Sequence, residues 1–257
     1  MSTPPTPPTP PTPPTLDVLR AEAERLALPL DTQALMRFAR YQALLREWHD
    51  RAGLTAITDP AEVQRRHFGE SLALLAALRF VGILLPGAQT HIADLGTGAG
   101  FPGLPMHIAD PSLHLTLIES NSRRCRFLEA VVADLGLDHV EVINLRAEEA
   151  GRVPNLREHF EVVVARALSA MNVLVEYALP LLRDGGLLAA PKGSRALDEL
   201  AEAAPAIAAL GGTAPDPLTL PQPSYAPPQY VMLVRRTGAL QDRYPRRPGM
   251  PTRRPLA

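Results

Sequence analysis

The residues with the clearest capacity for chemistry lie in one glycine-rich segment near the middle of the chain. Residues 91–103 read HIADLGTGAGFPG, in which an acid, Asp94, precedes a run of glycines. Glycine lets the backbone turn tightly and lets a ligand approach without a Cβ in the way. Glu119 ends the next apolar run, 25 residues after Asp94, where a carboxylate can accept hydrogen bonds from ribose hydroxyls. The segment therefore predicts a binding site for a cofactor that contains a ribose.

Two classes of cofactor share this glycine pattern. Gly98, Gly100 and Gly103 match the G-x-G-x-x-G spacing of enzymes that bind NAD(P). Asp94, just ahead of Gly96, favours S-adenosylmethionine instead, because a carboxylate can hold the methionine ammonium or an ordered water but would repel a pyrophosphate. We therefore favour S-adenosylmethionine. A NAD(P)-dependent oxidoreductase remains the alternative.

Residues after later strands can complete the same pocket. Ala147 and Glu148 follow the third predicted strand, where this type of fold places the adenine. Arg166 follows the fourth strand, at the edge where open α/β sheets bind their ligands. An arginine in that position has few purely structural reasons to be there, so we expect Arg166 to contact the cofactor or the substrate.

The elements that must position these residues alternate along the second part of the chain. Short apolar runs predict strands at 91–95, 115–118, 140–145, 160–165 and 186–190. Helical spacing predicts helices at 124–135, 170–182 and 196–210. This alternation predicts crossover units and a parallel sheet. A final strand at 230–234 follows a proline-rich link without a helix, so we expect it to be antiparallel. The prediction is an α/β, Rossmann-like fold with a mostly parallel, seven-stranded sheet and helices on both faces.

The first part of the chain has a different pattern. Residues 1–15 contain a repeated Pro-Pro-Thr unit, which cannot bury a core and predicts a disordered extension. Residues 16–86 predict helices, with one apolar stripe that should pack on the next domain and a helix cap at Asp59. The stripe consists of Leu35, Phe38, Tyr41, Leu45 and Trp48. We thus expect an extension (1–15), a helical region (16–86), a cofactor-binding domain (87–236) and a C-terminal tail (237–257).

Composition and charge narrow the classes of function. Cys125 is the only cysteine, so no internal disulfide is possible and the cytoplasm is the default location. We find no apolar run long enough for a membrane helix and no secretory signal. The net charge is −1, yet residues 235–257 contain seven arginines and one acid, or about +6. A basic tail on an acidic body is typical of contact with nucleic acid, although a role in solubility remains open.

Several motifs together carry a resemblance to a known family. They are GLTAITDP (53–60), RRHFGES (65–71), DLGTGAGFPGLP (94–105), RAEE (146–149), ARAL (165–168), PKG (191–193) and YPRRPGMPTRRPL (244–256). With these motifs the sequence resembles bacterial 16S rRNA methyltransferase G, also called glucose-inhibited division protein B, from about residue 16 onward. Three positions depart from the usual family residues: His49 and Gly53, where Asn is common, and Glu70, where Asp is usual.

The resemblance implies methylation of guanine N7 in the 530 loop of 16S rRNA by a class I methyltransferase. It implies 16S rRNA or the small ribosomal subunit as the partner, no metal, no membrane and a monomer. A non-enzymatic RNA-binding protein remains a further alternative. Arg166 or Lys192 is expected to contact the guanine. The expected cofactor contacts are Asp94, Gly96, Gly98, Gly100, Phe101, Glu119, Ala147, Glu148 and Arg166. The expected RNA contacts are Arg65, Arg66, His67, Arg243, Arg246, Arg247, Arg253 and Arg254.

Overall fold

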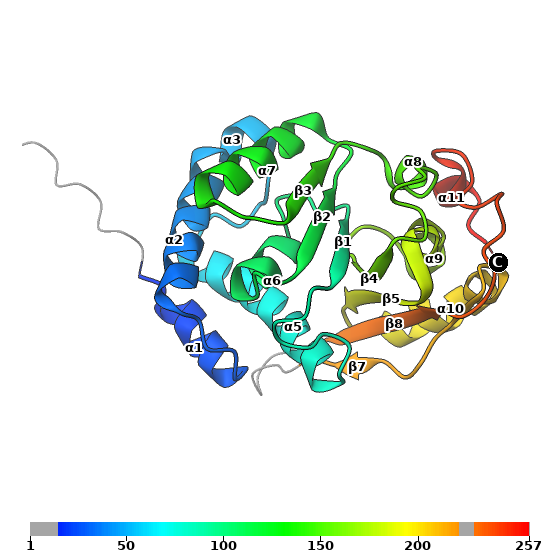
Figure 1. Cartoon of the computed structure of the whole chain (residues 1–257), viewed down its shortest axis with the longest axis horizontal. Coiled ribbons are helices and arrows are strands. Elements are labelled where there is room, and N and C mark those ends of the chain that lie inside the picture. Colours follow the sequence, from blue (N-terminus) through cyan, green and yellow to red (C-terminus); the bar gives the residue numbers. More distant parts are fainter. Residues whose placement is uncertain (1–14, 221–228, 257) are drawn as a thin grey trace, which may run out of the picture.

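One mostly parallel sheet forms the centre of the computed structural model, which describes residues 15–220 and 229–256 (Figure 1). The strand order is β3-β2-β1-β4-β5-β8-β6, and β7 also pairs with β8. The strands are β1 (His91–Leu95), β2 (His114–Ile118), β3 (Val140–Ile143), β4 (Phe160–Val164), β5 (Leu182–Lys192), β6 (Gly212–Thr213), β7 (Leu218–Thr219) and β8 (Tyr230–Arg236). Strands β1 to β5 pair in parallel, and β8 is antiparallel to β5. The predicted Rossmann-like fold and the reversed last strand are confirmed, but the sheet has eight strands rather than seven, because the segment before β8 adds the short strands β6 and β7.

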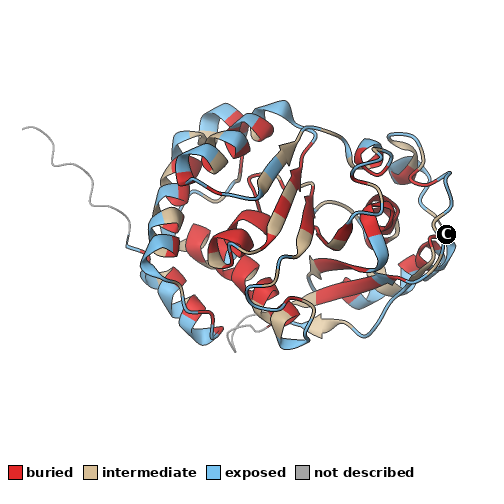
Figure 2. Ribbon diagram, in the orientation of Figure 1, coloured by how far each residue is buried: buried red, intermediate tan, exposed pale blue. Residues whose placement is uncertain are grey.

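The central strands are buried on both faces, which explains why they read as short apolar runs rather than as alternating patterns (Figure 2). On β1, Ile92 packs into a core with α2, α5, α6 and α7, while the next residue, Ala93, packs into a second core with α9 and α10. On β4, Val162 likewise packs into the first core and Val163 into the second. Helices therefore cover both faces, as predicted.

The helices of the first part pack on the sheet rather than forming a core of their own. They are α1 (Asp17–Arg25), α2 (Thr32–Glu47), α3 (His49–Ala52), α4 (Pro60–Glu62), a π-helical stretch η1 (Val63–Gly69) and α5 (Glu70–Phe80). Phe38 and Tyr41 of the predicted stripe are fully buried in the core that also contains Ile92. The predicted cap is present, because the Asp59 side chain accepts a hydrogen bond from the Glu62 N–H (2.9 Å).

The helices of the second part follow the strands, and the largest differences from the predicted boundaries are at α9 and β5. They are α6 (Gly103–Ala109), α7 (Ser122–Leu135), α8 (Ala147–Ala150), α9 (Met171–Ala178), the 3-10 turn η2 (Leu179–Leu181), α10 (Ala196–Ala209) and α11 (Met250–Arg253). The helix predicted over 170–182 ends at Ala178, since Pro180 cannot continue the α-helical hydrogen bonding. Strand β5 begins at Leu182 rather than 186. The prediction missed the start of the strand because Arg183, Asp184 and Gly185 are not apolar.

The C-terminal segment folds back onto α8 and α9 (Figure 1). Tyr244 is buried there, and Gly249 N–H donates a hydrogen bond to Glu148 Oε1 (2.8 Å). Of the predicted extension, residues 1–14 lie outside the described residues, as do 221–228 of the proline-rich link. In the part of the chain that is described, no helix has the length and apolar character needed to cross a membrane.

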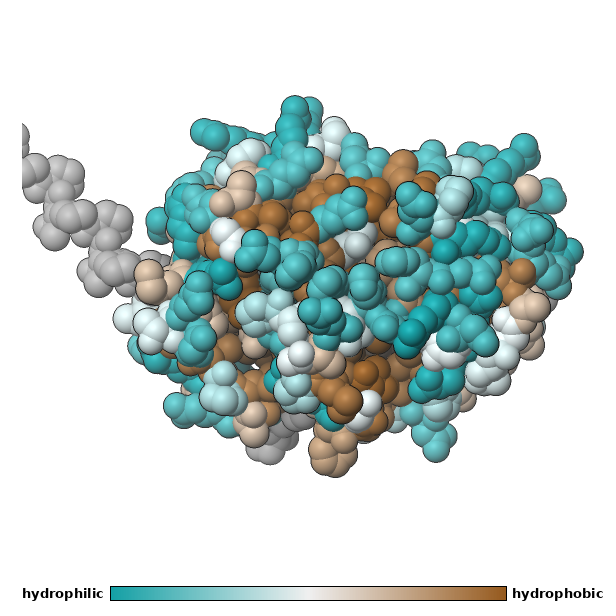
Figure 3. Space-filling view, in the orientation of Figure 1, coloured by the Kyte–Doolittle hydropathy of each residue, from teal (hydrophilic) through white to brown (hydrophobic). Residues whose placement is uncertain are grey.

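Most of the surface seen in Figure 3 is hydrophilic. Apolar side chains gather near the lower edge of the view, where α5 ends. Phe80, Val81 and Leu85 are exposed in this stretch of the chain. This apolar area is separate from the sheet edge that carries the chemistry.

Candidate cofactor site at the carboxyl edge of the sheet

Asp94 organises the loop that leaves β1. Its carboxylate is fully buried, and Oδ2 accepts hydrogen bonds from Thr97 Oγ1 (2.6 Å) and Gly103 N–H (2.8 Å). These two bonds join the start and the end of the glycine loop. Oδ1 is buried and has no hydrogen-bond partner among the described residues. Burial raises the pKa of Asp94 to about 6, although the hydrogen bonds from Thr97 and Gly103 act in the opposite direction.

The glycines of the loop serve two different purposes. A Cβ at Gly98 (φ +63°) would point into open space, with no heavy atom of the described residues within 4 Å. A Cβ at Gly96 (φ +68°) would instead lie 2.5 Å from Leu168 Cδ1, and one at Gly100 would meet Leu104 and the Tyr41 hydroxyl. Gly96 and Gly100 are therefore required by packing, whereas Gly98 borders free space that a ligand can enter.

Glu119, which follows β2, lies beside this free space. Its Oε2 accepts the Gly98 N–H (3.0 Å), and its Oε1 accepts the Asn121 N–H (2.8 Å). The buried carboxylate therefore connects the glycine loop to the first turn of α7. Each oxygen retains capacity to accept a further hydrogen bond. The structure thus brings Asp94, the loop glycines and Glu119 together at the carboxyl ends of β1 and β2.

Arg166 reaches the same edge from β4, and the helices of the first part hold its guanidinium. NH1 donates to the Arg66 carbonyl (3.0 Å) and to Glu70 Oε2 (3.4 Å), and NH2 donates to His67 Nδ1 (3.2 Å). The guanidinium carbon lies 5.3 Å from the centre of the Phe101 ring. Burial lowers the pKa of Arg166, whereas the charges of Glu70 and Asp94 raise it. An arginine nevertheless stays protonated in such a setting, so this group is a fixed cation.

His67 connects Arg166 to the loop that carries Thr55. Its ring stacks on Phe101, with centroids 4.5 Å apart and an interplanar angle of 13°. Because Nδ1 accepts from Arg166, we assign the proton to Nε2, which then donates to Thr55 Oγ1 (2.8 Å). Burial, together with the charges of Arg166 and Arg66, lowers the pKa of His67 to about 4. The ring is therefore neutral at pH 7, and it faces the cluster around Arg166 rather than bulk solvent.

Sequence reasoning did not identify Thr55, Glu70 or Tyr41 as parts of this site. Tyr41 donates a short hydrogen bond to the Ala99 carbonyl, so α2 also fixes the glycine loop. One local signal was present: His67 and Glu70 are three residues apart in a helical segment, which places them on one face. The contact of Thr55 with His67 has no such signal, because a loop and a helix meet there.

Two further predicted site residues are held by other partners. Lys192 Nζ donates to the Ser169 carbonyl (2.6 Å) and to Glu199 Oε2 (2.8 Å), and its side chain is 12% exposed. Glu148 is buried and accepts the Gly249 N–H, so it joins α8 to the C-terminal tail, while Ala147 beside it is half-buried. Lys192 does not contact the Arg166 cluster.

The arginines predicted to bind RNA divide into two groups. Arg246 makes a bidentate ion pair with Glu176, which is completely buried, and therefore stabilises the folded tail. Arg65 pairs with Glu62, and the Arg243 guanidinium lies 4.9 Å from the centre of the Tyr244 ring. The second group is exposed and forms no ion pair with any described residue; it consists of Arg66, Arg247, Arg253 and Arg254.

Comparison with known proteins adds independent information. The model of the family described as rRNA small subunit methyltransferase G matches residues 34–216. The "Ribosomal RNA small subunit methyltransferase G" of Roseiflexus castenholzii is 42% identical over 243 residues, which cover 94% of this chain and 100% of the relative. That of Lactobacillus johnsonii is 40% identical over 240 residues, covering 93% and 99%. A solved structure of a predicted O-methyltransferase from Agrobacterium tumefaciens is 21% identical, covers 65% of this chain and 80% of its own, and has a TM-score of 0.49.

Proposed function

The chain belongs to the rRNA small subunit methyltransferase G family, and from that premise we propose that it transfers a methyl group from S-adenosylmethionine to N7 of a guanine in the 530 loop of 16S rRNA. Residues 87–236 form the cofactor-binding unit in this proposal. The single structural observation that carries it is the convergence of two buried carboxylates, Asp94 and Glu119, on the glycine loop in which Gly98 borders open space.

The donors and acceptors at the carboxyl edge fit S-adenosylmethionine. A buried carboxylate oxygen without a partner is costly, and the positively charged amino group of the cofactor, or a water bound to it, would satisfy Asp94 Oδ1. Glu119 can accept hydrogen bonds from ribose hydroxyls, and Ala147 and Glu148 would border the adenine. The same carboxylate argues against the nicotinamide alternative, because Asp94 would repel a pyrophosphate.

The reaction needs little general acid–base catalysis by the protein. S-adenosylmethionine supplies an electrophilic methyl group, and guanine N7 has a free lone pair at neutral pH, so no general base is needed. The protein contributes chiefly by positioning the two reactants. An arginine can donate to guanine O6 and leave N7 free. Arg166 is the favoured candidate because it lies beside Phe101 and Asp94 of the glycine loop, and Lys192 is the second candidate.

Exposed cations would supply the contact with RNA. Arg66, Arg247, Arg253 and Arg254 are free to neutralise phosphates, while Arg246 holds the tail in place. In this proposal the substrate is 16S rRNA, presented in the small ribosomal subunit. The enzyme acts as a monomer in the cytoplasm, without a metal.

Two measurements test this function. Calorimetry should show binding of S-adenosylmethionine and its demethylated product, and much weaker binding of NAD. Incubation with the methyl-labelled cofactor and small ribosomal subunits should then transfer label to the RNA. Tighter binding of NAD would refute the methyltransferase, and cofactor binding without any transfer would favour a non-enzymatic RNA-binding protein.

A further inference from the structure

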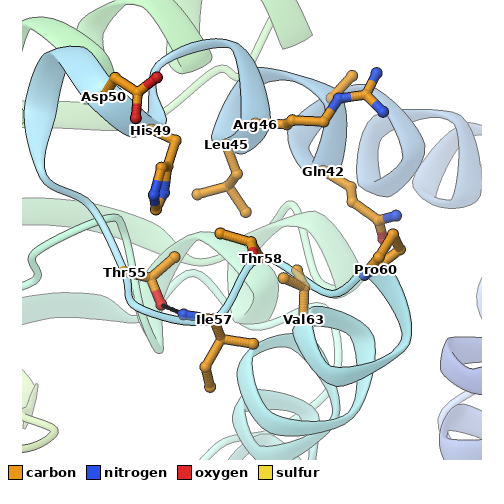
Figure 4. Close-up of a pocket in the computed structure, with 11 residues that line it drawn as sticks. Gln42, Leu45, Arg46, His49, Asp50, Thr55, Ile57, Thr58, Pro60 and Val63 are labelled. Carbon is orange, nitrogen blue, oxygen red and sulfur yellow. Dashed lines mark hydrogen bonds between the residues drawn. The ribbon is translucent and has the colours of Figure 1, made fainter.

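The helical part of the molecule contains a cavity that the proposed chemistry does not use. It has a volume of about 260 Å³ and lies between helices α2 and α3 and the loop that joins α3 to α4 (Figure 4). Its walls include the apolar side chains of Leu45, Ile57 and Val63. Pockets for drug-sized ligands are roughly 300–1,000 Å³. A cavity slightly below that range suits one flat ring system rather than a complete cofactor.

Gln42 gives this cavity a hydrogen-bond donor that no described residue uses. Gln64 fixes the orientation of Gln42, because Gln64 Oε1 accepts from Leu19 N–H (3.2 Å) and Gln64 Nε2 donates to the Thr15 carbonyl (2.8 Å). Gln64 Nε2 also donates to Gln42 Oε1 (3.1 Å), which occupies the oxygen of Gln42. The amide nitrogen of Gln42 therefore remains as a donor, and no described residue accepts from it, although the residue as a whole is 94% buried. Nucleobase edges carry the acceptors that such a group needs.

His49 provides a flat ring at the same cavity. Figure 4 shows its imidazole reaching from α3 toward the loop with Thr55, while Leu45 points into the same space from α2. Sequence-specific RNA recognition uses unstacked bases that stack on aromatic rings, including histidine. Apolar walls, one ring and one free donor are the combination that an unstacked base requires.

The cavity is adjacent to the Arg166 cluster. Thr55 lines the cavity, and its Oγ1 makes the 2.8 Å hydrogen bond to His67 Nε2. His67 in turn bonds to Arg166 and stacks on Phe101. A single side chain, His67, therefore separates the wall of the cavity from the residue expected to face the target guanine.

The surroundings of the cavity carry positive charge that suits an RNA backbone. Arg46 lines the cavity together with one exposed acid, Asp50, and the cations outnumber it, since Arg51 lies on α3 and Arg123 and Arg126 lie in the first turns of α7. The Arg124 guanidinium donates to the Gly53 carbonyl (3.1 Å), which joins the start of α7 to the end of α3. Arg46, Arg51, Arg123 and Arg126 are exposed, and no ion pair with another described residue neutralises them. The phosphates of a strand that enters here would meet these cations.

From these observations we propose that the cavity binds an unstacked base of the RNA substrate, a near neighbour of the target guanine in the strand. This inference rests on the proposed function and extends it. His49 stacks on the base, Gln42 donates to its edge, and the arginines of α3 and α7 hold the adjoining phosphates. The cavity thereby fixes the register in which the target guanine reaches Arg166.

The test uses the full-length protein and two variants of the cavity. Thr58→Trp adds a ring at an exposed position of the lining and fills the cavity, and His49→Ala removes the stacking ring. Thr213→Trp makes the same change at an exposed threonine on the far strand β6 and serves as the control. RNA affinity is measured by fluorescence with 530-loop fragments that carry 2-aminopurine at each position flanking the guanine. Turnover on small subunits and the dissociation constant for S-adenosylmethionine are measured in parallel.

Both cavity variants should weaken RNA binding about tenfold, the range expected for loss of one base–aromatic stack, and should leave cofactor affinity unchanged. One 2-aminopurine position should change its fluorescence on binding to the wild type and not to Thr58→Trp, and His49→Phe should restore affinity. Unchanged RNA affinity in both variants would overturn the inference, as would a parallel loss in Thr213→Trp. Weaker cofactor binding in the cavity variants would also overturn it, by assigning the cavity to the cofactor. The fluorescence arm needs no turnover, so it separates failure of this inference from failure of the proposed function.

Discussion

The two edges of the parallel sheet both carry polar residues, but their chemistry differs. At the carboxyl ends of the strands, carboxylates and an arginine surround the glycine loop, and Gly98 borders open space. At the amino ends, four imidazole rings follow one another across the sheet. His114 lies between His139 (centroids 4.4 Å apart) and His91 (4.9 Å), and His159 lies 5.0 Å from His91 on the other side.

Each edge contains a buried polar atom that has no hydrogen-bond partner among the described residues, namely Asp94 Oδ1 and His114 Nε2. At the carboxyl edge, several groups with spare hydrogen-bonding capacity come from different strands and face a common space. At the amino edge, the rings mainly contact one another. One unpartnered atom is therefore weak support for a binding site, and convergence of complementary groups on open space is the stronger criterion. Substitutions at the carboxyl edge should therefore affect cofactor binding or turnover, and substitutions at the amino edge should not.

The largest effect is expected at Gly98. Gly98→Val places a β-branched residue at φ +63° and a side chain in the open space, so S-adenosylmethionine should bind at least about 100-fold more weakly by calorimetry. Gly136→Val is the matched control, since Gly136 has φ +56° with open space around its Cβ but ends α7 on the way to the amino edge. The control should lose similar stability and retain cofactor affinity. Equal cofactor affinity in the two variants would place the site elsewhere.

A smaller effect, a loss of turnover, is expected from Arg166→Lys, which keeps the charge and loses the planar donor group. Turnover at saturating cofactor and small subunits should fall by about 10- to 100-fold, roughly 1.4–2.8 kcal/mol, with little change in cofactor affinity. Arg183→Lys, at the start of β5 on the amino edge, should have no effect. If cofactor affinity falls in step with turnover, Arg166 mainly holds the cofactor. No change in either quantity would exclude it from the site.

The site and the fold were predictable from the sequence to different degrees. Strands such as 91–95 and 230–234 were found because a buried strand leaves a local apolar signature. Asp94 and Glu119 were found because they follow such strands directly. The contacts of Tyr41 with Ala99 and of His67 with Phe101 join segments that are distant in sequence, and local patterns carry no information about them.

The C-terminal tail illustrates the same limit on reading local patterns. Its charge predicted a surface for nucleic acid, yet Arg246 neutralises the fully buried Glu176. Glu176 lies in the apolar helix α9, where a lone acid gives no sign of the partner that reaches it from a segment 70 residues away.

A change of about tenfold in cofactor affinity is expected for Asp94→Asn, which keeps an acceptor for Thr97 and Gly103 but removes the charge. S-adenosylmethionine affinity should fall, and the free protein should become more stable at pH 7. The raised pKa means that the folded wild type binds an extra proton between about pH 4 and pH 6, so its stability falls as the pH rises through that window. Melting temperatures from pH 4 to pH 7 should show this fall in the wild type and not in Asp94→Asn. A variant with normal cofactor affinity would contradict the role of the carboxylate.

A several-fold loss of RNA affinity is expected when the exposed arginines of the tail are replaced. The tail packs on α8 at the carboxyl edge. The triple variant Arg247→Ala, Arg253→Ala, Arg254→Ala should weaken RNA binding and reduce the slope of log affinity against log salt by about 2. Its melting temperature should equal that of the wild type. By comparison, Arg246→Ala should lower the melting temperature because it leaves Glu176 buried without a partner. An unchanged salt slope in the triple variant would remove the tail from the RNA surface.

The smallest effect is expected at the amino edge, with His114→Gln. Burial and the neighbouring His139 and His91 lower the pKa of His114, while Glu161 opposes this. A lowered pKa means that the stability contributed by a neutral His114 is present above about pH 6.5 and is lost as the pH falls. The difference in melting temperature between pH 7.5 and pH 5.5 should therefore narrow by about 1–2 °C in the variant. Cofactor binding should not change, and a clear loss of it would contradict the separation of the two edges.

The central claim is that the carboxyl edge binds S-adenosylmethionine and delivers its methyl group to guanine N7. The most direct test incubates the protein with cofactor carrying an isotopic methyl group and small ribosomal subunits that lack the modification, followed by mass spectrometry of the digested 16S rRNA. The account predicts one labelled guanine, within the 530 loop, with the label at N7, and no label with Gly98→Val. Label on another base or another atom of guanine, or no label while the cofactor remains bound, would contradict it.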